Sequence, residues 1–259
     1  MPRFRPGLTA ILRTLLFVAL AATLTRVAVA APRPRRPSST SPVPQTSSGS
    51  CHPNVTHPGV ERWSIKTSLP TAGAPDTAHA KLVDFAALIA LTVPQPGGQP
   101  IKENDERFRD TRIPAFDNSL GVNEGDLVTV RGWLWLVATS NDDGDYHIQI
   151  SGSATSGDGA LIVEVPNPDP AFVSSPDLRA VFTAVRQFVK TSLLHDPSLE
   201  PSACGNVMTH PPYVQVTGQL FYDDSHIDPA SRGKKGMKAA TSWEIHPVID
   251  MKFAPKPNP

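Results

Sequence analysis

The sequence has 259 residues with 24 basic and 24 acidic side chains, so its formal net charge is zero. Residues 1–50 contain seven arginines and no acid, which leaves residues 51–259 with 17 basic against 24 acidic side chains, a net charge of −7 with histidine neutral. An acidic folded region disfavours general binding of nucleic acid or anionic lipid, because affinity for phosphate comes largely from Lys and Arg contacts.

The N-terminus has the features of an export signal. Three arginines precede or adjoin the apolar run Leu15–Leu24, and Ala28-Val29-Ala30 supplies a small-x-small cleavage pattern. The rival interpretation is an uncleaved anchor, but the apolar run is shorter than the about 20 residues that a spanning helix needs. We therefore predict that residues 1–30 are a signal peptide, that the protein is secreted or periplasmic, and that no integral membrane segment remains after cleavage.

Composition and cysteine use define the limits of the folded region. Residues 31–50 are rich in Pro, Ser, Thr and Arg and predict a disordered linker, and residues 254–259 predict a disordered tail. The only two cysteines, Cys51 and Cys204, suit a single disulfide in an exported protein. Free thiols or a cysteine-based catalyst fit less well, because neither cysteine lies in a nucleophile motif.

Residues 51–120 predict an N-terminal extension packed on the main domain. Within it, Trp63–Thr67 has the character of a short strand. Ala78–Leu91 has apolar residues at helical spacing and predicts a helix. The mixed charge run Lys102–Arg112 predicts a self-neutralised, solvated surface; an anion site formed by its arginines is the alternative.

Residues 121–253 predict a small barrel. The predicted strands are Leu127–Ala138, Tyr146–Ile150, Ala160–Val165, Tyr213–Tyr222 and Ser242–Phe253, and the predicted helix is Pro176–Leu194. Gly132 and Gly218 lie inside strands one and four, as glycine does where a barrel strand bends. The order β-β-β-α-β-β predicts a mainly β protein with a five-stranded, OB-like Greek-key barrel and an N-terminal α/β extension. In that topology we expect strand one to pair with strands two and four and, at closure, with strand five.

Four short segments resemble a set of exported bacterial proteins, mostly of unassigned function. The segments are Glu61–Thr67, Gly144–His147, Ile162–Pro166 and Glu244–Val248, and the similarity runs from about Glu61 to Phe253. The resemblance implies a secreted OB-like domain without an assigned ligand or reaction. The charged loop Ser231–Lys238 departs from the more neutral loop of the relatives, which puts a shared binding role of this loop in doubt.

One group of residues could form a polar site. It consists of Asp145, His147, Glu164, Glu244 and His246, which lie on or beside predicted strands two, three and five. If they meet, two imidazoles and a carboxylate could bind a divalent metal. The alternative is that the histidines bond loop backbones and hold the barrel ends. The spacing matches no established metal motif, so the sequence predicts no metal ligand with confidence.

A second group lies in the loop between strands four and five. Its candidate ligand-binding residues are His226, Arg232, Lys234, Lys235 and Lys238. This loop flanks the ligand face in many OB-folds, so four cations could contact phosphates there. The alternative is a solvated, flexible loop.

No nucleotide-phosphate loop, no GxSxG elbow and no catalytic dyad appears in the sequence. We therefore expect a monomeric, non-catalytic binding module without a cofactor, whose partner is a polymer or a protein. The alternatives are a metal-dependent hydrolase using His147, Glu164 and His246, and oligonucleotide or oligosaccharide binding through the loop before strand five.

Overall fold

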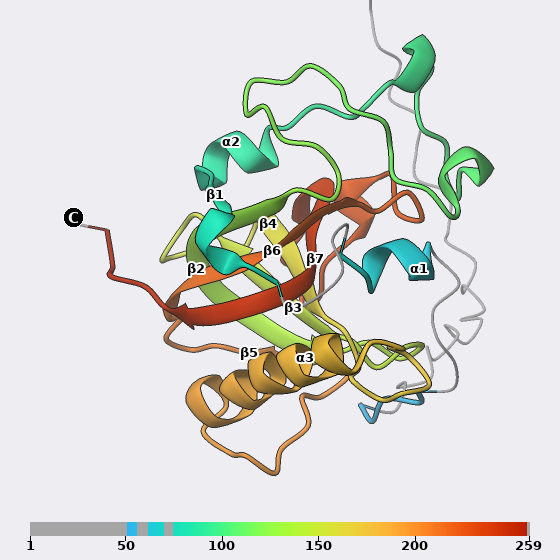
Figure 1. Ribbon diagram of the computed structural model, residues 1–259. Helices are drawn as coiled ribbons and strands as arrows, with labels where there is room; N and C mark the ends of the chain where they lie inside the picture. Colours follow the sequence, from blue (N-terminus) through green and yellow to red (C-terminus); the bar gives the residue numbers. More distant parts are fainter. Residues whose placement is uncertain (1–50, 56–61, 70–74, 258–259) are drawn as a thin grey trace, which may run out of the picture. The chain divides into compact units, whose positions relative to one another are not determined.

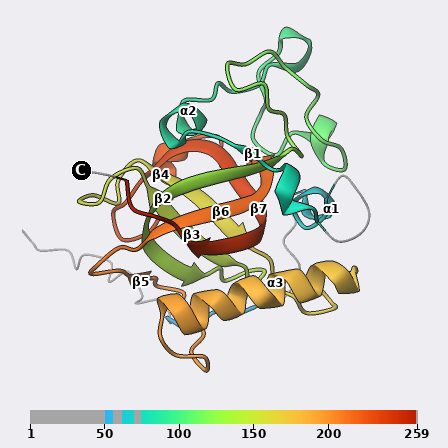
Figure 2. The same cartoon turned by 60° about the vertical axis from the view of Figure 1, so that its left-hand side comes forward.

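The computed structural model describes residues 51–55, 62–69 and 75–257, and the predicted signal peptide and linker lie outside them. Five strands form a closed barrel (Figures 1 and 2). They are β2 (Leu127–Thr139), β3 (Tyr146–Ser151), β4 (Ala160–Val165), β6 (Tyr213–Tyr222) and β7 (Ala239–Phe253). The predicted OB-like fold is confirmed.

The pairing of the strands closes the barrel. β2 pairs antiparallel with β3 and β6, β3 pairs antiparallel with β4, and β6 pairs antiparallel with β7. The ring closes through a parallel pairing of β4 with β7. The expected pairing of strand one with strand five was therefore wrong. The observed closure places the third and fifth strands side by side, which matters for the site described below.

Every second side chain along the strands points inward and fills the interior of the barrel. Tyr146, Ile148 and Ile150 of β3 are fully buried in the hydrophobic core, while the residues between them face outward. Gly218 of β6 allows a close approach of β7. A Cβ atom added there would lie 2.4 Å from the carbonyl oxygen of Pro247, so a larger residue requires the strands to move apart.

A single long helix, α3 (Pro176–Phe188), connects β4 to the second half of the barrel. Ser175 caps its N-terminus by accepting a hydrogen bond from the backbone N–H of Leu178. The helix continues as a π-helical turn, Val189–Leu193, close to the predicted end at residue 194. Figures 1 and 2 show α3 below the barrel, and its apolar face (Leu178, Phe182 and Val185) is buried.

The N-terminal extension differs from its predicted secondary structure. Trp63–Thr67 is not a strand, because Trp63–Lys66 forms the short helix α1. The predicted helix Ala78–Leu91 is only partly present. Lys81–Leu82 forms strand β1, which pairs with the edge of β2, and Phe85–Ile89 forms helix α2. The exposed backbone of β2 captures this segment, since Val83 also donates a hydrogen bond to the carbonyl of Thr129 (2.9 Å).

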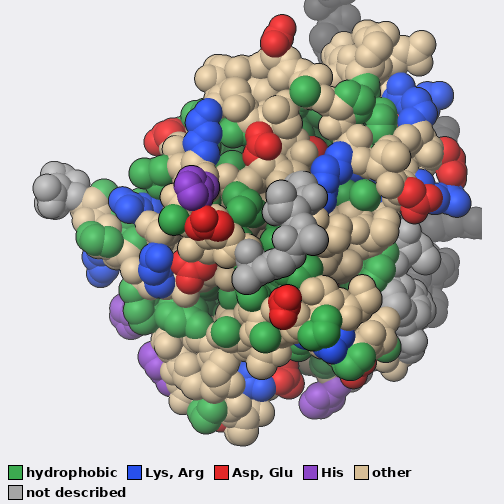
Figure 3. Space-filling view, in the orientation of Figure 1, with side chains coloured by type: hydrophobic (Ala, Val, Ile, Leu, Met, Phe, Trp, Pro, Cys, Tyr) green, Lys and Arg blue, Asp and Glu red, His purple; other side chains and the backbone are tan. Residues whose placement is uncertain are grey.

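The charge run of the extension pairs with itself. Arg107 contacts Asp105 at 2.6 Å, and Arg109 contacts Glu106. Over the described part of the face in Figure 3, basic and acidic side chains are interspersed. These contacts favour a self-neutralised surface over an anion site.

The predicted disulfide between Cys51 and Cys204 is present. Ala203 also donates a backbone hydrogen bond to the carbonyl of Cys51 (3.0 Å), so the start of the described chain is held against the segment before β6. Between residues 51 and 257, leaving out the undescribed stretches, no helix is long and apolar enough to cross a membrane.

Tyr222 at the end of β6 predicts a loss of stability in alkali. Burial, followed by the nearby charges of Asp223 and Asp224, raises the pKa of Tyr222 to about 12 from 10.0. The folded state therefore keeps a proton that the unfolded chain releases near pH 10, so the stabilisation is complete below pH 10 and is lost between pH 10 and 12. We expect the free energy of unfolding to fall by roughly 2 kcal/mol more over this range than in Tyr222→Phe. Urea titrations at pH 9, 10, 11 and 12 test this, and equal losses in both proteins contradict it.

Candidate functional site

The candidate site is built on the outer face of the barrel, where β3, β4 and β7 run side by side. In the register of the strands, His147 lies opposite Glu164, and the parallel pairing of β4 with β7 places Glu244 opposite Ile162. His246 follows two residues later on β7, so its side chain shares this outer face with Glu244. Three neighbouring strands thus place polar side chains on the same outer face of the barrel.

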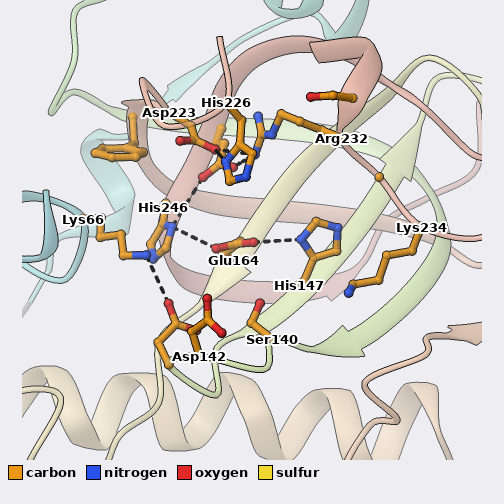
Figure 4. A pocket seen from close by; sticks show the side chains of 15 residues that line it. Lys66, Ser140, Asp142, His147, Glu164, Asp223, His226, Arg232, Lys234 and His246 are labelled. Carbon is orange, nitrogen blue, oxygen red and sulfur yellow. Dashed lines mark hydrogen bonds and ion pairs between the residues drawn. The ribbon is translucent and has the colours of Figure 1, made fainter. Parts of the chain in front are cut away.

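Glu164 is the centre of this group. One of its carboxylate oxygens lies 2.8 Å from Nδ1 of His147, and the other lies 3.3 Å from Nδ1 of His246. Figure 4 shows the two imidazoles on opposite sides of Glu164. On the far side of its ring, Nε2 of His246 lies 3.3 Å from Oδ2 of Asp145, while Nδ1 also lies 3.4 Å from Glu244. All five residues of the predicted polar site therefore come together.

Burial and charge act in opposite directions on these groups. Burial raises the pKa of Glu164, but its hydrogen bond with His147 and its ion pair with His246 outweigh burial and hold the pKa well below its ordinary value. Burial likewise opposes the charged form of His246, but its contacts with Asp145 and Glu164 leave the pKa raised. Both shifts favour the charged forms, so the Glu164 carboxylate and the His246 imidazole attract each other.

Part of the loop between β6 and β7 packs against this group. Arg232 is 8% exposed; its guanidinium contacts Glu244 and lies 3.1 Å from Asp223. Gln149 on β3 fixes the next part of the loop, since its side chain accepts a hydrogen bond from Lys234 N (2.6 Å) and donates one to Met237 O (3.0 Å). Arg232 and Gln149 thus anchor this part of the loop to the barrel, while Ser231, Gly233, Lys235 and Lys238 are exposed.

Loop and strands together enclose a pocket of about 270 Å³. The lining residues are Lys66, Ser140, Asp142, Asp143, His147, Glu164, Phe221, Asp223, His226, Ser231, Arg232, Gly233, Lys234, Glu244 and His246. Of the predicted loop residues, His226, Arg232 and Lys234 line the pocket, whereas Lys235 and Lys238 are exposed and do not. Four residues of the predicted polar site (His147, Glu164, Glu244 and His246) and three of the predicted loop residues thus line the same pocket.

Several lining residues were missed by sequence reasoning. Lys66 of α1 reaches the pocket from the N-terminal extension, where its ammonium lies 3.1 Å from Asp143. Burial, and the neighbouring charge of Asp145, raise the pKa of Asp143. Lys66 lies in the segment Glu61–Thr67, and Asp143 lies in the acidic turn before Gly144. Both are in or beside segments that resemble exported bacterial proteins, and this position was the sequence feature that could have identified them.

Comparisons with protein-family models, with curated proteins and with solved structures find no match to this chain. The function is therefore inferred from the geometry and chemistry of the pocket.

Proposed function

We propose that this chain is an exported, OB-like binding module that holds a hydroxyl-rich saccharide in the pocket between β3, β4 and the loop before β7. The position of the pocket carries the proposal. OB-folds bind oligonucleotides and oligosaccharides on the face of their second and third strands, between the loop joining strands one and two and the loop joining strands four and five. Here the same elements supply His147, Glu164, Ser140–Asp143 and Ser231–Lys234.

The charge of the lining favours a saccharide over an oligonucleotide. Five carboxylates line the pocket against three Lys and Arg side chains. Two of the three cations are already paired, since Lys66 contacts Asp143 and Arg232 contacts Asp223. Such a pocket repels a phosphate backbone. A sugar hydroxyl both donates and accepts hydrogen bonds, so it pairs equally with carboxylates and with ammonium or guanidinium groups.

The size of the pocket limits the ligand. Its volume of about 270 Å³ lies just below the range of about 300–1,000 Å³ that is typical of small-molecule sites. We therefore expect recognition of one or two sugar units, such as the end of a longer chain.

The test is calorimetric titration with neutral and acidic mono- to tetrasaccharides in the presence of a chelator. Asp142 is exposed and Lys234 half-buried, so the double variant Asp142→Asn, Lys234→Ala changes the pocket without disturbing the core. We expect at least tenfold weaker binding in this variant and unchanged binding in Lys235→Ala, whose side chain lies outside the pocket. Binding of no saccharide, or equal binding by all proteins, refutes the proposal. Tighter binding of an oligonucleotide than of any saccharide also refutes the proposal, if salt and Lys235→Ala weaken that binding.

The second candidate function is metal-dependent hydrolysis of an ester, which the bridge from His147 through Glu164 to His246 favours. Glu164 holds Nδ1 of His147, which leaves Nε2 to take a proton from water. The water oxygen would bond to the electrophilic atom of the ester as the bond to the leaving oxygen breaks, and the leaving oxygen would take up a proton. Turnover of phosphodiester and carboxyl-ester substrates that is lost in His147→Ala tests this function. No turnover of either class excludes it.

A further inference from the structure

Beyond saccharide binding, we propose that Asp145, Glu164 and His246 bind one divalent transition-metal cation, such as Zn²⁺ or Mn²⁺. Glu164 and His246 line the pocket, and Asp145 is buried beside His246. One ligand atom from each residue lies within 4.8 Å of the others. Ligand distances of about 2.0–2.2 Å keep the ligand atoms of one cation about 3–4 Å apart. Binding would therefore draw the three side chains slightly closer together than they lie in the structure.

The lack of hydrogen-bond partners for the buried ring nitrogens of His246 is an independent observation that points to a ligand. Its side chain is 1% exposed, and neither ring nitrogen makes a hydrogen bond of good geometry, although both lie 3.3 Å from a carboxylate oxygen. Oδ2 of Asp145 is equally buried and also lacks a hydrogen bond. Buried polar atoms of this kind are rare unless a water or an ion completes them. A cation bound at one ring nitrogen would satisfy that nitrogen and the carboxylate oxygen that faces it together.

The surrounding contacts orient both carboxylates toward the ring of His246. Oδ1 of Asp145 accepts a hydrogen bond from the backbone N–H of Asn167 (2.8 Å), and Oδ2 faces His246. Oε1 of Glu164 contacts His147 (2.8 Å), and Oε2 faces His246. Each carboxylate thus has one oxygen held by the protein and the other facing a ring nitrogen of His246, Nε2 for Asp145 and Nδ1 for Glu164. Outer contacts of this kind are a regular feature of metal sites, where they fix the direction of the ligands.

The donor set selects the class of cation. One imidazole with two carboxylates suits zinc, manganese and related transition metals, whereas Ca²⁺ and Mg²⁺ prefer sites made of oxygen alone. Two carboxylates also balance the charge of a divalent ion, and Glu244 adds a third negative group 3.4 Å from the imidazole. The ammonium of Lys66 opposes a cation here, but Asp143 contacts it at 3.1 Å.

The experiment is titration of chelator-treated protein with ZnCl₂ or MnCl₂ in the absence of any saccharide, followed by calorimetry and, for Mn²⁺, by electron paramagnetic resonance. We expect one ion per chain with a micromolar or lower Kd. Glu164→Gln and Asp145→Asn are both expected to bind at least tenfold more weakly, and circular dichroism checks that each variant is folded. His226→Gln, which changes another histidine of the same pocket, is expected to bind like the parent protein.

Three results overturn the cation site: no binding by the parent protein, equal binding by a folded Glu164→Gln or Asp145→Asn, or a loss as large in His226→Gln. This inference fails separately from the saccharide proposal. The saccharide titration contains a chelator and uses variants outside the three metal ligands, so either proposal can stand when the other falls.

Discussion

Replacing Arg62 with methionine is expected to lower the free energy of unfolding by about 3–5 kcal/mol. The guanidinium is 3% exposed and forms two parallel hydrogen bonds of 2.7 Å with the carboxylate of Glu124, which is fully buried. Its remaining N–H groups donate to the carbonyl oxygens of Phe108 (2.9 Å), Thr111 (2.9 Å) and Tyr222 (3.0 Å). All five donors of the side chain are therefore satisfied, and the substitution leaves Glu124 buried without its counter-charge.

The size of this effect follows from the position of the pair. It connects the N-terminal extension to the end of β6, directly before the pocket loop, so its loss separates segments that are far apart in the sequence. Urea unfolding measures the effect. The control is Arg109→Met, because Arg109 and Glu106 form a mostly exposed pair (63% and 72%) for which we expect a change below about 0.5 kcal/mol. Equal, small changes in both variants would contradict this account of the extension.

Removing the disulfide is the second large effect. We expect the double variant Cys51→Ser, Cys204→Ser to lose about 3 kcal/mol of unfolding free energy, because the bond closes a loop with a sequence separation of 153. A cross-link of this span restricts the unfolded chain strongly. It also holds residues 51–55 against the barrel, where the carbonyl of Cys51 accepts hydrogen bonds from Ala203 N and Ser202 Oγ.

Unfolding with and without a reducing agent measures the contribution of the disulfide. The parent protein is expected to lose the same stability on reduction, whereas the double variant is expected to be insensitive to the reducing agent. A parent protein whose unfolding midpoint does not move on reduction would show that the bond contributes nothing to stability.

The barrel was predictable because its strands are long and their patterns are strong. Ala160–Val165 and Tyr213–Tyr222 have the predicted limits, since Gly- or Pro-containing turns flank the first and a clear alternation defines the second. β7 begins at Ala239, three residues before the predicted start, because Ala239 pairs with Ala160 of β4. That contact depends on the parallel closure, which local sequence does not encode.

The extension was less predictable because its elements are short. Trp63 supports a helix through contacts that lie far away in the sequence. Its indole N–H donates to the carbonyl of Phe172 (3.0 Å), and its ring packs edge-on against the Phe172 ring. Over four or five residues such contacts outweigh intrinsic strand or helix preference.

For the site, residue chemistry was predictable and convergence was not. Asp145, His147, Glu164, Glu244 and His246 were recognisable from their types and from their places beside predicted strands. Their meeting depends on the register of β3 with β4 and on the parallel pairing of β4 with β7.

Local sequence also could not predict that the loop before β7 forms part of the pocket. The position of the loop depends on long-range contacts, namely those of Gln149 with Lys234 and Met237 and those of Arg232 with Asp223 and Glu244. No local sequence pattern predicts these contacts, because each joins residues on different elements.

The most direct test of the account is a saccharide titration of isotope-labelled protein followed by backbone and histidine-ring NMR. The account predicts that resonances of Ser140–Asp143, His147, Ser231–Lys234 and His246 shift together with saccharide concentration. Residues of the distant surface around Trp133 and Tyr213, which lie outside the pocket, are predicted to remain unchanged. Shifts confined to Trp133 and Tyr213, or no shift with any saccharide, would contradict the assignment of ligand binding to this pocket.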